Sequence, residues 1–82
     1  MVEAIGLGFK KGDFVMIKDI HFVKSKFPSN QMDQLCRISG LGTRNLEIEL
    51  YYLGKPLGIG TYLKFDQVEK IENQDMVRLL YG

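Results

Sequence analysis

The chain has 82 residues, of which 45% are hydrophobic and 26% are charged, and its net charge is +1. This length indicates one domain, and the ordinary composition excludes a largely disordered chain. The near-neutral charge weighs against a protein that holds nucleic acid mainly by neutralising phosphates. The single cysteine, Cys36, excludes an internal disulfide, and with one histidine the sequence predicts no metal site and no cofactor.

No apolar run reaches the roughly 18 residues that a membrane-crossing helix needs. Residues 1–8 lack the basic start and the long apolar core of a signal peptide. We therefore expect a cytoplasmic protein with no membrane partner.

The first half of the chain predicts one strand and one long loop. Residues 1–9 are apolar and contain two glycines, which fits either a loose arm or an extra strand. Residues 10–13 predict a turn, and residues 14–18 a strand with two apolar faces, so we expect it to be covered on both sides. Residues 19–34 fit neither the helical nor the strand period and predict a loop; alternatively, residues 20–23 extend the first strand.

The centre of the predicted fold is the stretch that follows. Residues 34–39 predict a strand, residues 40–44 a turn, and residues 45–53 a strand with a clear period of two. A turn over residues 54–58 then leads to a strand at 59–65. In the middle strand one face carries Leu46, Ile48, Leu50 and Tyr52, and the other carries Glu47, Glu49 and Tyr51.

The last segment predicts two short elements. Residues 65–68 can form one helical turn with Asp66 as its cap, after which Val68 and Ile71 return to the core. Residues 73–82 predict a strand or a short helix capped by Asn73 or Asp75. The predicted core is Val15, Ile17, Cys36, Ile38, Leu46, Ile48, Leu50, Leu63, Phe65, Val68 and Ile71.

Residues 11–17, with the sequence Lys-Gly-Asp-Phe-Val-Met-Ile, resemble the opening of SH3-like small β-barrels of the KOW and Tudor sort. A long loop, three meander strands and a short helical turn complete the likeness over residues 10–72. The resemblance implies an all-β protein, a partly open SH3-like barrel of five or six short antiparallel strands. Residues 1–9 and 73–82 flank this domain. KOW motifs carry a basic, glycine-rich turn after the first strand, whereas residues 19–26 contain no glycine. The likeness therefore implies fold rather than function.

The sequence predicts no catalytic residues. Cys36 shares a strand face with Ile38, as a small core residue does, and His21 falls in the predicted loop. Glu47 and Glu49 read as an exposed polar strand face. We expect a protein that is not an enzyme.

We expect a small binding or adaptor module whose partner is a protein or a peptide. Aromatic side chains beside carboxylates suit a cationic ligand, through cation–π attraction. The alternative is a nucleic-acid-binding barrel, for single-stranded nucleic acid or RNA, which would use Lys24, Lys26 and Arg37 with the same aromatics. The predicted partner-binding residues, from the loop at 22–34 and the strands, are Phe22, Lys24, Lys26, Phe27, Glu47, Glu49, Tyr51 and Tyr62.

The apolar ends of the chain add a prediction about assembly. Residues 2–9 and 76–81 can complete the core by pairing with a second copy, which would make the protein a homo-oligomer. Alternatively, the two ends pair with each other inside one monomer.

Overall fold

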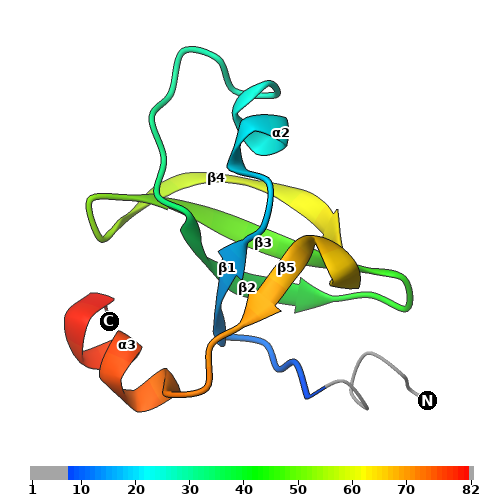
Figure 1. Cartoon of the computed structure of the whole chain (residues 1–82), viewed down its shortest axis with the longest axis vertical. Coiled ribbons are helices and arrows are strands. Elements are labelled where there is room, and N and C mark those ends of the chain that lie inside the picture. The colour runs from blue at the N-terminus through cyan, green and yellow to red at the C-terminus, as the bar shows by residue number, and fades with distance from the viewer. Residues whose placement is uncertain (1–7, 82) are drawn as a thin grey trace.

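The computed structural model describes residues 8–81, and Figure 1 shows how their helices and strands are arranged. Residues 1–7 of the predicted arm lie outside the described residues. The elements in chain order are β1 (Phe14–Ile17), α2 (Ile20–Lys24), β2 (Leu35–Leu41), β3 (Asn45–Tyr52), β4 (Lys55–Lys64), the 3-10 turn η1 (Phe65–Gln67), β5 (Val68–Lys70) and α3 (Gln74–Tyr81).

The five strands form one antiparallel sheet in the order β4-β3-β2-β1-β5. Strands β1 to β4 follow one another as neighbours, and β5 returns to pair with the free side of β1. The predicted all-β class is therefore confirmed. The sheet is open, with β4 and β5 as its two edges.

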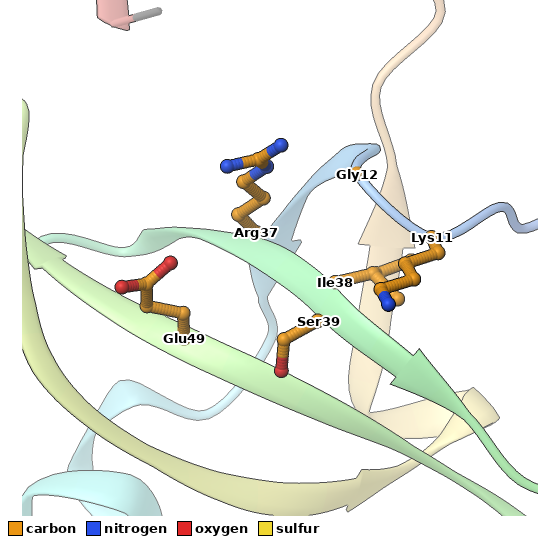
Figure 2. A pocket seen from close by; sticks show the side chains of 6 residues that line it. All are labelled: Lys11, Gly12, Arg37, Ile38, Ser39 and Glu49. Atoms are coloured by element: carbon orange, nitrogen blue, oxygen red, sulfur yellow. The ribbon is translucent and has the colours of Figure 1, made fainter.

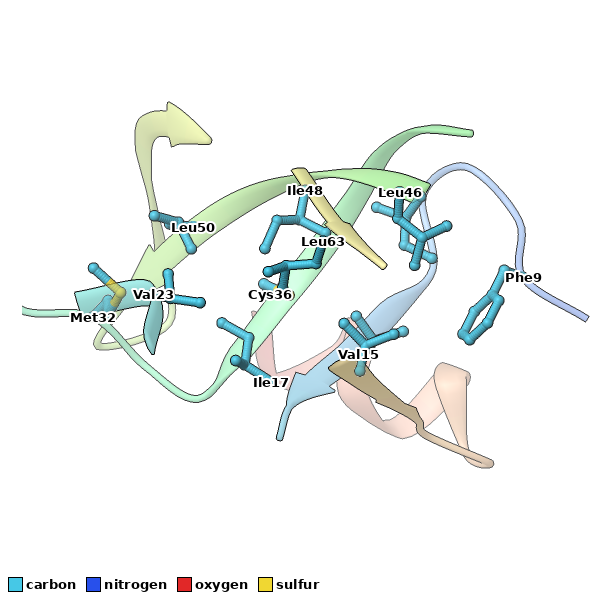
Figure 3. Close-up of a cluster of buried hydrophobic side chains, with 12 residues drawn as sticks. Phe9, Val15, Ile17, Val23, Met32, Cys36, Leu46, Ile48, Leu50 and Leu63 are labelled. Atoms are coloured by element: carbon cyan, nitrogen blue, oxygen red, sulfur yellow. The ribbon is translucent and has the colours of Figure 1, made fainter. Parts of the chain in front are cut away.

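The main core lies on the inner face of this sheet, as Figure 3 shows. Leu46, Ile48 and Leu50 of β3 are each 0% exposed, as the period of two predicts. Nine predicted core residues are buried here, and Phe65 packs against them while partly buried. The prediction missed Phe9, Val23 and Met32, which are buried in the same cluster. Burial of each such side chain contributes about 1.5–3 kcal/mol.

A second, smaller cluster covers the opposite face of β1. Phe14, Leu35 and Tyr51 are buried there, and Val77 of α3 packs against them. Ile71, predicted for the main core, packs in this cluster instead. The expectation that β1 is covered on both faces is thus confirmed, and among the described residues α3 contributes to the cover.

The segment after β1 is helical, so the predicted loop or strand extension at residues 20–23 is wrong. Asp19 caps α2 by accepting a hydrogen bond from the backbone N–H of Phe22, at 3.1 Å. Val23 is fully buried in the main core, which fixes the helix against the sheet. The rest of the loop is tied to the β3–β4 turn, because the Asp33 carboxylate accepts hydrogen bonds from the N–H groups of Leu53 and Gly54, each at 3.0 Å.

Several predicted strand and turn boundaries shift, most of all around the two turns that flank β3. The turn predicted at residues 54–58 is a tight turn at Leu53 and Gly54, whose φ angles of 53° and 80° are left-handed. This geometry matches the right-handed twist of hairpin strands, so β4 begins at Lys55. Strand β2 runs to Leu41, which shortens the turn before β3 to residues 42–44.

The predicted cap of the helical turn is also wrong. Lys64, not Asp66, occupies the N-cap position of η1. The N–H of Lys64 donates to Oε1 of Gln67 at 2.8 Å, so the last residue of the turn closes it.

Gly60 allows the close approach of β4 to β3. A Cβ at this position would overlap the carbonyl oxygen of Ile48, a backbone atom that cannot move away. We predict that Gly60→Ala lowers the free energy of unfolding by about 3 kcal/mol in urea titrations. The control is Gly58→Ala, where φ is +78° but no atom lies within 4 Å of the added Cβ. We expect a loss of about 1 kcal/mol there, and an equal loss at the two positions would contradict the argument.

The side-chain amide of Gln74 continues the hydrogen bonding of β1 beyond the end of β5. Its Oε1 accepts from the N–H of Phe14 at 2.8 Å, and its Nε2 donates to the carbonyl of Phe14 at 2.9 Å. We predict that Gln74→Ala destabilises the protein by about 1–3 kcal/mol, because the N–H and carbonyl of Phe14 and the carbonyl of Ile71 all lose this partner. The exposed neighbour Glu72 is the control, and Glu72→Ala should change stability by less than about 0.5 kcal/mol.

Candidate functional site

The outer face of the sheet, opposite the main core, carries charged and aromatic side chains from three strands. The pairing places Arg37 of β2 opposite Glu49 of β3, and Glu47 of β3 opposite Tyr62 of β4. Ser39 lies two residues beyond Arg37 on the same strand. Because alternate residues of a strand share a face, Arg37, Glu47, Glu49 and Tyr62 belong to one surface. Ser39 lies at a bulge of β2 and borders the same surface, because it lines hollows together with Arg37, Glu47 and Glu49.

Three neighbouring hollows make this surface concave. The first, of about 370 Å³, is surrounded in Figure 2 by Arg37 and Ser39 of β2, Glu49 of β3 and Lys11 from the segment before β1. The second, of about 300 Å³, shares Ser39 and Glu49 and crosses β4. The third shares Glu47 with the second and reaches Tyr62. We call this continuous surface the trough; its lining residues are Lys11, Gly12, Arg37–Leu41, Gly42, Asn45, Glu47–Glu49, Gly58–Gly60 and Tyr62.

The charges of the trough are not neutralised by one another. Arg37 and Glu49 are register partners, yet no ion pair within 4.0 Å joins them. In the described part of the chain the ion pair found is that of Arg78 with Asp13, at 3.5 Å. Arg37 and Glu47 are exposed and Glu49 is half-buried. Their charged groups are therefore open to a ligand.

The predicted site residues do not form one cluster. Glu47, Glu49 and Tyr62 lie together in the trough. Phe22, Lys24 and Lys26 are exposed on and just after α2, whose Val23 is buried in the core on the inner face. Phe27 is half-buried and packs against the main core. The two exposed groups thus lie on different sides of the sheet.

The α2 group is held against the edge of β4. Nζ of Lys26 lies 4.9 Å from the ring centroid of Phe22 and 3.5 Å from Oγ1 of Thr61. The exposed face of Phe22 therefore already has a cation of this chain over it.

Tyr51 is not an exposed binding residue, and this prediction is wrong. Its side chain is 4% exposed and packs edge-to-face on Phe14, with ring centroids 5.6 Å apart. The second cluster covers this end of the outer face, whereas the Tyr62 end is uncovered. Tyr51 pairs with Pro56 and lies four positions along β3 from the partner of Tyr62, or about 13 Å, so the two tyrosines are not adjacent.

Three residues of the trough are missing from the predicted set of protein-binding or peptide-binding residues. Arg37 was considered for nucleic acid alone, and Lys11 and Ser39 were not predicted to bind a partner. Arg37 alternates with the buried Cys36 and Ile38, and this alternation is the signal that places it on the outer face.

Cys36 lies in the main core and His21 is exposed on α2. Burial raises the pKa of the Cys36 thiol to about 12 from an ordinary value of 9.0. Because the thiolate is the reactive form, Cys36 is not a nucleophile at neutral pH.

We predict that stability falls at high pH because of this thiol. The unfolded thiol ionises near pH 9.0 while the folded one stays neutral to about 12, so the unfolded state releases its proton first. The contribution of the thiol to the free energy of unfolding is complete below pH 9. It is lost as pH rises toward 12, by up to about 1.4 kcal/mol per pH unit. Urea unfolding below pH 9 and at about pH 11 measures the loss. Cys36→Ala should show a smaller fall, and an equal fall would contradict the assignment.

The helix α3 presents three apolar side chains to solvent. Met76, Leu79 and Leu80 are 57%, 88% and 74% exposed, while Val77 packs against the second cluster. Asn73 caps the helix by accepting a hydrogen bond from the N–H of Met76 at 3.0 Å. Assembly through the chain ends stays a prediction.

No helix within residues 8–81 is long and apolar enough to cross a bilayer. Comparison with protein-family models, with curated proteins and with solved structures finds no match to the chain.

Proposed function

We propose that the chain is a non-catalytic binding module that recognises a protein or a peptide through the trough. The observation that carries the proposal is the pairing of Glu47 with Tyr62 across β3 and β4. Tyr62 is 61% exposed and no described residue is placed over its ring as Lys26 is over Phe22. A lysine or arginine of a partner can contact the ring face and the carboxylate together, which strengthens each interaction.

We also propose that the fold is of the SH3-like type. The order of elements supports this: a meander from β1 to β4, one 3-10 turn, and a short β5 that returns beside β1. The long connection between β1 and β2 is the other feature of the likeness. Folds of this kind serve many tasks, so the function rests on the trough and not on the fold.

Nucleic acid is the second candidate. The exposed Lys24, beside Lys26 and the 42% exposed Phe22, offers positive charge next to an aromatic ring. Against it stand the net charge of +1 and the carboxylates of Glu47 and Glu49, which repel phosphate. The Tyr62 end of the trough therefore favours a cationic group of the partner.

The test is an amide NMR titration with a capped peptide of alternating lysine and glycine. We expect shifts at Glu47 and Tyr62, and about two- to fivefold weaker binding for Glu47→Gln and for Tyr62→Ala. Glu69→Gln, an exposed carboxylate on β5, is the matched control and should bind unchanged.

A parallel titration uses a mixed single-stranded oligonucleotide at low and moderate salt. The nucleic-acid alternative would replace this proposal if two results are found together. The oligonucleotide would shift the resonances of Lys24 and Lys26 in a way that fades with salt, and the lysine peptide would shift no resonance of Glu47. Absence of any shift at Glu47 and Tyr62 with the lysine peptide would overturn the proposal.

A further inference from the structure

The trough has opposite chemical character at its two ends. At one end Tyr62 and Glu47 offer a ring and a carboxylate. At the other end Lys11 and Arg37 offer two cations around the first hollow. Ser39 and Glu49 line both of the first two hollows and so connect the two ends, and the Glu49 carboxylate also borders the cationic end.

The strand pairing sets the distance between the two ends. Tyr62 is opposite Glu47 and Arg37 is opposite Glu49, so Tyr62 and Arg37 lie two strands across and two residues along. With about 4.8 Å between strands and 3.4 Å per residue, their Cα atoms are about 12 Å apart. An extended peptide advances about 3.3 Å per residue, and its alternate side chains point the same way. Side chains four residues apart therefore match both the distance and the direction.

We propose that the trough binds an extended peptide segment with a basic side chain at the Tyr62 end and an acidic side chain four residues away at the Arg37 end. This inference rests on the proposed function and names the class of its ligand. The Arg37 guanidinium makes no ion pair with its register partner Glu49, so a carboxylate of the ligand can bind it. Gly58 and Gly60 line the middle hollow without side chains, which lets a peptide backbone approach β4.

The probes are capped seven-residue glycine peptides titrated by amide NMR. One carries lysine at its second position and glutamate at its sixth, a second has the reverse order, a third carries lysine alone, and a fourth carries two lysines. We expect one lysine–glutamate order to bind about two- to fivefold more tightly than lysine alone, with shifts at Arg37 and Lys11. The peptide with two lysines should bind more weakly than the peptide with glutamate.

Charge reversal makes the test specific. Arg37→Glu should invert the preference, so that the peptide with two lysines binds more tightly than the lysine–glutamate peptide. Lys18→Glu makes the same charge change at an exposed position outside the trough and should leave the preference intact. Lys11→Glu is the second variant, because Lys11 lies outside the strands and its substitution leaves every strand residue unchanged.

The outcomes separate the two proposals. If lysine alone binds as tightly as both lysine–glutamate peptides and neither reversal changes the order, the inference is overturned while the proposed function stands. If no peptide shifts the resonances of the trough, both are overturned.

Discussion

The two-sided pairing of β3 is the constraint on which the rest of the structure depends. Its inner residues Leu46, Ile48 and Leu50 are fully buried, while its outer residues Glu47 and Glu49 face the trough. A slip of one residue would exchange the two sets, burying carboxylates and exposing aliphatic side chains, so the core holds the register of β2 and β4. The same register places Tyr62 beside Glu47 and Arg37 beside Glu49. The arrangement of the candidate site therefore follows from the packing of the core.

The shape of the trough comes from missing side chains. Gly60 is required because β4 approaches the carbonyl of Ile48 so closely, and Gly58 has the left-handed backbone that suits glycine. Both sit on the strand whose far side is an open edge of the sheet. Pro56, near the start of this edge, lacks the N–H that would pair with another chain. The free edge of β4 therefore lacks one hydrogen-bond donor near its start, while the part that contains Gly58 and Gly60 lines the trough.

The sequence predicted what local alternation determines and missed what tertiary contacts determine. The period of two over residues 46–50 of β3 identified its buried face because aliphatic residues and carboxylates alternate there without exception. The five-residue α2 is too short to show a helical period, and it is fixed by the cap at Asp19 and by the burial of Val23. The left-handed Leu53 could not be expected from its residue type, so the turn was placed on the glycines that follow. Tyr51 and Glu47 share one sequence pattern, but the second cluster covers only the Tyr51 end of the face.

If the trough binds a peptide as proposed, the arrangement of its charges affects the orientation of the peptide more than the affinity. Exposed ion pairs contribute little free energy each, because water screens them and long side chains lose freedom when they bind. Tyr62 is the one ring of the trough, so the apolar area that a short peptide can bury on it is small. In the proposed complex, opposite charges at the two ends would instead discriminate between the two directions in which an extended segment can lie. Under the proposed function, a partner that binds tightly must therefore extend beyond the trough, and Tyr62 and Arg37 would then determine which segment it presents and in which direction.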